Sequence, residues 1–264
     1  MKALIGSHDL LFVTLDTLRH DVAAGQLAAG RTPNLARVLP GGAWQRRHTP
    51  ASFTYAAHHA FFGGFLPTPV TPGPHERPFA ARFPGSTTVG EDTWEFDAPD
   101  VVTGLRAAGY HTICLGGVGF FAMTSAQGGV LPALFDEAHW TREFGVTNPG
   151  CFEAQLDRLR AVLPEDGPLF TFVNVAAMHQ PNRHYLPGAA QDGPDSHAAA
   201  LRYVDTLLPR LFTLLTWRRR PCFVVLCADH GTAYGEDGHH GHRVGHDVVW
   251  TVPYAEFTLS PGEW

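Results

Sequence analysis

Three short runs of the sequence are largely apolar and rich in β-branched residues. They cover residues 10–15, 169–176 and 222–228. Such runs are typical of strands in a parallel sheet that is covered on both faces. Further strands are expected at 110–116, directly after a helical segment, and at 250–257. Strands that alternate with helices in this way predict an α/β fold with a mostly parallel sheet.

Segments with helical patterns lie between these strands. Residues 32–40 have a proline at the first helical position and another at the end, and residues 54–64 have a polar start and a Gly-Gly end. Further helices are expected at 97–109, 152–163 and 196–217. Residues 67–96 are rich in Pro, Gly, Ser and Thr, and we expect them to form an ordered surface excursion. The length of the chain predicts one domain that spans 1–264.

The apolar strands end in polar residues. Asp16 directly follows the first strand, and Asp229 and His230 follow the strand at 222–228. Because the carboxyl ends of neighbouring parallel strands meet at one edge of a sheet, we expect these side chains to surround one cation. Oxygen and nitrogen ligands together suit Zn²⁺ or Mn²⁺ better than a bare calcium site. His179 is a further polar group offered from a strand end.

A hydroxyl lies at the start of the helix expected at 54–64. The positive end of the helix dipole and the free backbone N–H groups at such a position can hold a phosphate or another tetrahedral anion. His58 lies four residues after Thr54, on the same face of the helix. Taken alone, the plainer interpretation is that Thr54 caps the helix and that His58 is a packed histidine.

Five of the sixteen histidines lie close together behind Asp229. They are His230, His239, His240, His242 and His246. A solvated polar loop is the plainer interpretation of any single one, but the preceding strand fixes the position of His230. His242 lies between the metal-bearing strand and the final strand, so we expect it near the sheet edge. The other three are expected to lie mostly in the loop and at the rim.

Composition excludes several classes of partner. The net charge is −6, and the one basic cluster, at 217–220, looks like the C-terminal end of a helix, so we expect no nucleic-acid or membrane partner. The first apolar stretch is too short for a membrane span and has no cleavage-site pattern, which predicts a cytoplasmic protein. The four cysteines have no C-x-x-C spacing and are expected to be buried thiols.

Taken together, these motifs resemble the alkaline phosphatase/sulfatase superfamily. The matching segments are 16–21, 32–37, 54–64, 179–181, 229–231, and 241–242 followed by 252–253. Their order and rough spacing hold over nearly the whole chain. The resemblance implies a three-layer α/β/α sandwich with a mostly parallel central sheet. It also implies a metal-dependent hydrolase or transferase that acts on phosphate or sulfate esters.

The resemblance assigns roles to individual residues. Asp16, Asp229 and His230 match the metal ligands, and Thr54 matches the metal-bound nucleophile, which would form a phosphothreonine intermediate. One divalent ion is implied, Zn²⁺ or Mn²⁺ before Ca²⁺ or Mg²⁺, and a second ion stays open.

Three further histidines match catalytic positions. His58 falls where sulfatases place the arginine of their Cys-x-Pro-Ser-Arg signature. His242 falls where phosphoethanolamine transferases and nucleotide phosphodiesterases use a histidine, and His179 matches the histidine of a His-x-Pro segment that helps hold the ester. These side chains can act on the transferring group, or they can complete a second metal site.

The sequence also departs from sulfatases. Thr54 stands where a sulfatase needs Cys or Ser, and Gly117 stands where a lysine usually binds sulfate. The chain is therefore expected to be a compact, stand-alone relative that hydrolyses small-molecule phosphate monoesters or diesters. A sulfate-ester hydrolase, a phosphoryl-group transferase and a catalytically inactive metal-binding relative are the alternatives. The natural substrate and the oligomeric state are not determined by the sequence.

Overall fold

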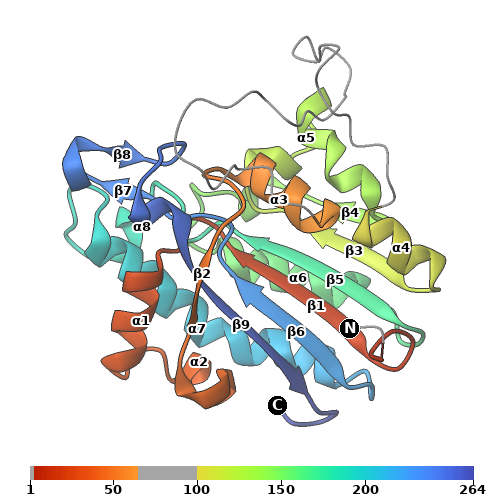
Figure 1. The fold of residues 1–264 in the computed structure, drawn as a ribbon. Coiled ribbons are helices and arrows are strands. Elements are labelled where there is room, and N and C mark those ends of the chain that lie inside the picture. Colours follow the sequence, from red (N-terminus) through yellow and green to blue (C-terminus); the bar gives the residue numbers. More distant parts are fainter. Residues whose placement is uncertain (1–2, 65–99) are drawn as a thin grey trace.

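A seven-stranded sheet organises the described part of the chain, which comprises residues 3–64 and 100–264 of a computed structural model (Figure 1). The strand order is β2-β9-β6-β1-β5-β3-β4. The strands are β1 (Asp9–Leu15), β2 (Gln45–His48), β3 (His111–Leu115), β4 (Glu137–His139), β5 (Leu169–Val175), β6 (Cys222–Cys227) and β9 (Thr251–Leu259). The surface excursion expected at 67–96 lies outside the described residues.

The centre of this sheet is parallel. β1 lies between β5 and β6, with Leu15 opposite Val175 and Thr14 opposite Cys227. β3 and β4 continue the parallel order, whereas β9 runs antiparallel to both β6 and β2. The prediction of a mostly parallel sheet is confirmed. Since β1, β5 and β6 are neighbours, the residues that follow their carboxyl ends are brought together.

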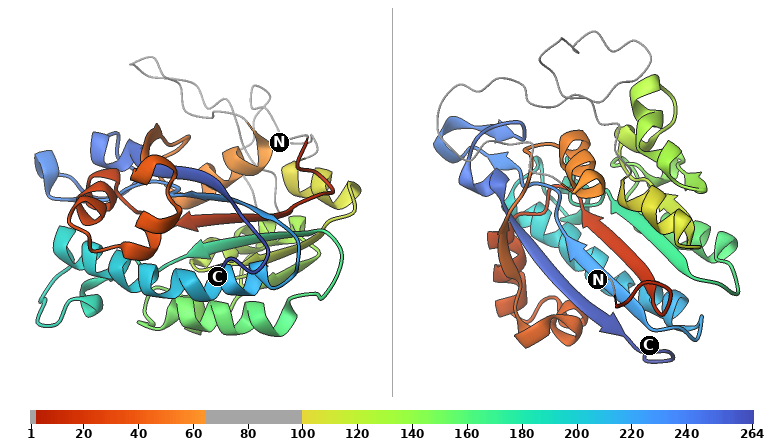
Figure 2. Two further views of the ribbon diagram at one scale, coloured as in Figure 1. Left: turned by 90° about the horizontal axis from the view of Figure 1, so that it is seen from below. Right: turned by 45° about the vertical axis from the view of Figure 1, so that its right-hand side comes forward.

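Helices cover both faces of the sheet and give the three expected layers (Figure 2). One face carries α1 (His20–Ala28), α2 (Pro33–Val38), α6 (Cys151–Val162) and α7 (Pro194–Thr216), whose apolar residues share a core with the strands. The other face carries α3 (Thr54–Gly63), α4 (Val101–Ala107) and α5 (Ala126–Val130), with a second core. Within the described ranges, none of these helices combines the length and apolar character that a membrane crossing needs.

Two arginines of the basic cluster at 217–220 pair with one buried carboxylate. α7 ends at Thr216, and Arg218 Nε then donates to Asp9 Oδ2 at 2.8 Å. Arg220 Nε donates to Asp9 Oδ1 at 3.1 Å. The sequence correctly predicted that these arginines follow a helix. Their partner, however, is the carboxylate of Asp9, the first residue of β1, rather than the end of the helix. The four cysteines are buried free thiols, as expected.

Candidate active site

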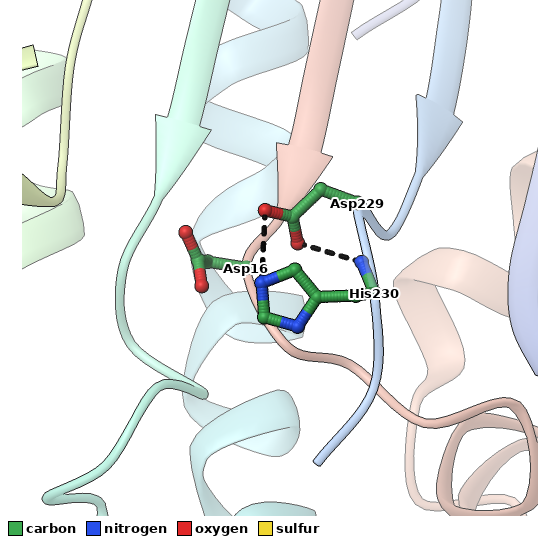
Figure 3. A group of neighbouring side chains, drawn as sticks. All are labelled: Asp16, Asp229 and His230. Carbon is green, nitrogen blue, oxygen red and sulfur yellow. Dashed lines mark hydrogen bonds and ion pairs between the residues drawn. The ribbon is translucent and has the colours of Figure 1, made fainter. Parts of the chain in front are cut away.

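Two carboxylates and an imidazole meet at the carboxyl edge of the sheet (Figure 3). Asp16 directly follows β1, and Asp229 and His230 follow β6 after one further residue. Each side chain offers a ligand atom within 4.8 Å of the other two, and all three are fully buried. The structure therefore brings together the three residues that the sequence singled out as metal ligands.

Hydrogen-bond donors hold each carboxylate mainly through one oxygen. Asp16 Oδ2 accepts from Asn174 Nδ2 at 3.1 Å, and Asp229 Oδ1 accepts from the backbone N–H groups of Thr17 (3.1 Å) and His230 (2.9 Å). Asp16 Oδ1 and Asp229 Oδ2 are buried and receive no hydrogen bond from the described residues. Buried carboxylate oxygens without a partner are costly unless a cation neutralises them. The donor set therefore fits a divalent cation.

Burial also determines the protonation of this group in the absence of a metal. It raises the pKa of Asp229 to about 7, and it raises the pKa of Asp16 with a further contribution from the Asp229 charge. Burial lowers the pKa of His230, so this imidazole is neutral at pH 7. Its Nδ1–H donates to Gly231 O at 2.8 Å, which leaves the Nε2 lone pair free to bind a metal.

These protonation states predict a pH-dependent metal affinity. A cation must displace protons from Asp16 and Asp229 below about pH 7, so the apparent affinity for Zn²⁺ or Mn²⁺ is expected to fall from pH 8 to pH 5. Titration calorimetry in buffers of different ionisation enthalpy should show more proton release at pH 6 than at pH 8. An affinity that stays constant over this range would contradict the assignment.

Thr54 is the first residue of α3, but its side chain does not cap the helix. The N-cap residue is Phe53, and no side chain makes a cap hydrogen bond. The Thr54 hydroxyl instead lies 3.2 Å from His230 Nε2 and 3.5 Å from Asp16 Oδ2. The interpretation of Thr54 as a helix cap is therefore wrong. Its oxygen lies beside the buried carboxylates and imidazole, where the resemblance places a nucleophile.

His58 lies one turn further along α3 and is fully buried. Its Nδ1–H donates to Thr54 O at 2.7 Å, and its Nε2 accepts from Thr14 Oγ1 at 3.0 Å. The surrounding rings belong to Phe61, Phe62, Phe121 and Phe172. Burial lowers the pKa of His58 to about 3. The neutral side chain joins the start of α3 to β1 through these hydrogen bonds. The geometry therefore does not favour the expected contact of His58 with the substrate.

His179 and His242 face a pocket next to Thr54. Their ring centroids are 5.4 Å apart, and the His242 ring lies 4.7 Å from that of His230. Together with Thr54 they line a cavity of about 410 Å³. Burial, with the neighbouring imidazoles and a nearby arginine, lowers the pKa of His242 to about 3. His242 is therefore neutral near pH 7 and can donate an N–H or offer a lone pair.

The other histidines of the loop lie further out. His239 and His240 are exposed, and His240 belongs to the short β7–β8 hairpin (Ala233–Tyr234 and His240–Gly241). His246 pairs with Asp237 at 3.1 Å and caps α8 (Asp247–Trp250). These positions match the expected rim.

Asn174 is a site residue that the sequence reasoning missed. It lies in β5, where its Nδ2 donates to Asp16 Oδ2 and Thr14 Oγ1, both at 3.1 Å. Its Oδ1 accepts from the backbone N–H groups of Gly117 (3.3 Å) and Val118 (3.2 Å). A buried amide inside an otherwise apolar strand needs partners, so its presence in the run at 169–176 was an available signal.

The sequence comparison identifies the family. The chain matches the family described as Sulfatase over residues 8–254, and it therefore belongs to the sulfatase family. This family lies in the alkaline phosphatase/sulfatase superfamily, whose members are hydrolases and transferases of phosphate or sulfate esters and are typically metal-dependent. No curated protein matches the chain in sequence.

Solved structures with low sequence identity share the fold. The soluble domain of lipooligosaccharide phosphoethanolamine transferase A from Neisseria meningitidis has a TM-score of 0.63 at 13% identity, covering 96% of this chain and 77% of that one. The C-terminal periplasmic domain of EcEptC from Escherichia coli, in complex with Zn, gives 0.63 at 11% identity, covering 98% and 74%. The lipoteichoic acid synthase LtaP from Listeria monocytogenes gives 0.62 at 13% identity, covering 96% and 65%.

Proposed function

We propose that this chain is a metal-dependent hydrolase of phosphate esters with Thr54 as its nucleophile. The observation that carries the proposal is the position of Thr54 Oγ1, which is free of a cap role and lies 3.2 Å from His230 Nε2. Asp16, Asp229 and His230, together with Thr54, would hold a divalent cation. When bound, this ion would lower the pKa of the Thr54 hydroxyl and neutralise charge on the phosphoryl group. Zn²⁺ and Mn²⁺ are the first candidates.

The reaction follows from the groups around Thr54. Attack of its oxygen on phosphorus would form a phosphothreonine, with loss of the hydroxyl proton, and would release the alcohol with gain of a proton. His179 and His242 face the same pocket and are placed to hydrogen-bond the phosphoryl oxygens or the leaving oxygen. Water would then hydrolyse the phosphothreonine and restore the free hydroxyl.

Two features support phosphate esters over sulfate esters. Thr54 cannot be converted to the formylglycine that the resemblance assigns to sulfatases. A Cβ atom on Gly117 would lie 2.4 Å from Asn174 O, so no lysine side chain fits at this position without displacing β5. The packing around Gly117 therefore excludes a lysine at this position.

Turnover of model substrates tests the proposal. p-Nitrophenyl phosphate, its phenyl phosphodiester analogue and p-nitrophenyl sulfate should be compared with Mn²⁺ or Zn²⁺ added. Release of p-nitrophenol from a phosphate substrate, abolished by chelation, is the expected result. Turnover of the sulfate alone would favour the sulfatase alternative, and no turnover of any substrate would favour an inactive metal-binding relative.

Phosphoryl transfer is the second candidate, because solved structures with this fold include a phosphoethanolamine transferase. Transfer needs an alcohol to replace water in the second step. Phosphorus NMR of a reaction with added glycerol distinguishes the two, since hydrolysis gives inorganic phosphate and transfer gives a new ester. A cytoplasmic location without a membrane partner stays a prediction from the sequence.

Removing His242 is expected to slow turnover far more than removing His240. His242 faces the pocket beside Thr54, whereas His240 is exposed on the β7–β8 hairpin. Loss of a group that stabilises charge in the transition state costs on the order of 10²–10³ in rate. His242→Ala should show such a loss in kcat, and His240→Ala should stay close to the unaltered protein. Equal, small effects would remove His242 from the mechanism.

A further inference from the structure

Among the described residues that line the pocket beside Thr54, one carries a permanent charge, Arg243. Beyond Thr54 and the two histidines, the described lining is apolar or neutral and includes Val118, Phe120, Ser125, Gln127 and Val146. Among the residues that the structure describes, no carboxylate lines it. A single cation in such a pocket is an attractive position for an anionic group of a ligand.

The backbone fixes Arg243 close to the nucleophile. Its N–H donates to Ser52 O at 2.8 Å, which ties the His-rich loop to the segment that leads into α3. Its φ is 70°, in the left-handed region that non-glycine residues rarely adopt. The guanidinium lies over the ring of Phe53, with Cζ 5.3 Å from the centroid. Phe53 directly precedes Thr54, so Arg243 is anchored to the segment that carries the nucleophile.

The guanidinium of Arg243 has no ion-pair partner within residues 3–64 and 100–264. By contrast, Arg19 is paired with Asp21 and Glu236, and Arg218 is paired with Asp9. A guanidinium stacked on an aromatic face keeps the N–H groups at its edge available. Those groups match the two oxygens of a carboxylate or phosphate.

Arg243 and Thr54 line the same pocket but differ in their exposure to solvent. The transferred phosphoryl group must contact Thr54, which is only 2% exposed and lies among buried ligand-type side chains. Arg243 is exposed, and its guanidinium lies over the ring of Phe53. Phe120, whose ring centroid is 6.4 Å from that of Phe53, gives the same pocket an apolar lining together with Val118 and Val146. The cavity of about 410 Å³ that both residues line thus has space for the organic part of an ester.

We propose that this pocket is a leaving-group subsite for phosphate esters whose alcohol part carries a second oxyanion next to an apolar or aromatic body. Arg243 binds the carboxylate or phosphate of that alcohol, and Val118, Phe120 and Val146 contact its body. This inference rests on the proposed phosphate-ester hydrolase. It names the class of substrate that the site prefers.

The test compares two substrates that differ in one charge. 4-Carboxyphenyl phosphate carries the second anion, and 4-carbamoylphenyl phosphate is its neutral counterpart of nearly the same shape. The quantity measured is the ratio of their kcat/KM values. Arg243→Gln is expected to lower this ratio about 10–100-fold, the range typical of a charge-assisted hydrogen bond. Arg243→Lys should keep part of it, and Arg31→Gln, which removes an exposed charge outside the pocket, should leave it unchanged.

The remaining outcomes also decide for or against the inference. If Arg243→Gln slows both substrates equally, the ratio is unchanged, and Arg243 acts on the transferred phosphoryl group rather than on a second anion. If neither ester is turned over, the proposed function fails, but calorimetric binding of the same pair to metal-loaded protein still tests the subsite. The subsite is supported if the carboxylate ester binds more tightly than the carbamoyl ester and Arg243→Gln removes this preference. Equal affinities of the two esters overturn it.

Discussion

Thr54→Ala is expected to abolish turnover of phosphate esters while leaving the metal site largely intact. The hydroxyl of Thr54 is the attacking group, and the loss of a nucleophile typically costs on the order of 10⁴–10⁶ in kcat. Asp16, Asp229 and His230 remain to hold the cation, so elemental analysis should still find it. The helix should also remain, because the Thr54 side chain does not cap α3.

Ser52 provides the matched control for this substitution. It carries a hydroxyl two residues before Thr54, but within residues 3–64 and 100–264 only its backbone carbonyl is engaged, by Arg243 N–H. Ser52→Ala should therefore retain turnover, and Thr54→Ser should retain part of it. Mass spectrometry of a quenched reaction should find phosphate on Thr54. Phosphate on Ser52, or full activity in Thr54→Ala, would refute the assignment of the nucleophile.

The sequence predicts the centre of the sheet because burial there determines composition. β1, β5 and β6 are covered on both faces and so consist mainly of apolar residues, which a pattern search can find. The edges carry no such signal. β2, with the sequence Gln-Arg-Arg-His, is exposed at every position, and β4 has three partly buried residues. Both strands form because a neighbouring strand offers them hydrogen bonds, which local sequence does not record.

The site was predictable where a strand end fixes a side chain. Asp16 and Asp229 follow buried parallel strands, so the edge of the sheet brings them together. His58 could not be assigned in this way, because its position on a helix leaves open whether it faces the pocket or the core. Phe172, from β5, is one of the rings that enclose it. Arg243 was missed because its place depends on a long-range hydrogen bond to the segment before α3.

Asp229→Asn is expected to remove the metal and, with it, the catalytic activity. The amide keeps an oxygen that can accept from Thr17 N–H and His230 N–H, so the local backbone should be retained. The charge that binds the cation is lost. Losing a direct ligand should cost more than the 10–100-fold typical of residues that only orient ligands. Elemental analysis should find the metal in the unaltered protein and in Asp237→Ala, whose carboxylate is exposed, but not in Asp229→Asn.

In the absence of metal, the same substitution is not expected to harm the protein, because it should leave the free energy of unfolding unchanged or raise it at high pH. Burial raises the pKa of Asp229 from 3.8 to about 7, so the folded protein retains a proton that the unfolded chain releases. The resulting stabilisation is full below about pH 4 and is lost as the pH rises through about 7. Asp229→Asn lacks this loss and should be at least as stable in thermal unfolding as the unaltered metal-free protein at pH 8.

Adding Zn²⁺ or Mn²⁺ should then stabilise the unaltered protein, by about 2.7 kcal/mol at a hundred times Kd. Asp229→Asn should not respond, and an equal response of both proteins would place the ion elsewhere.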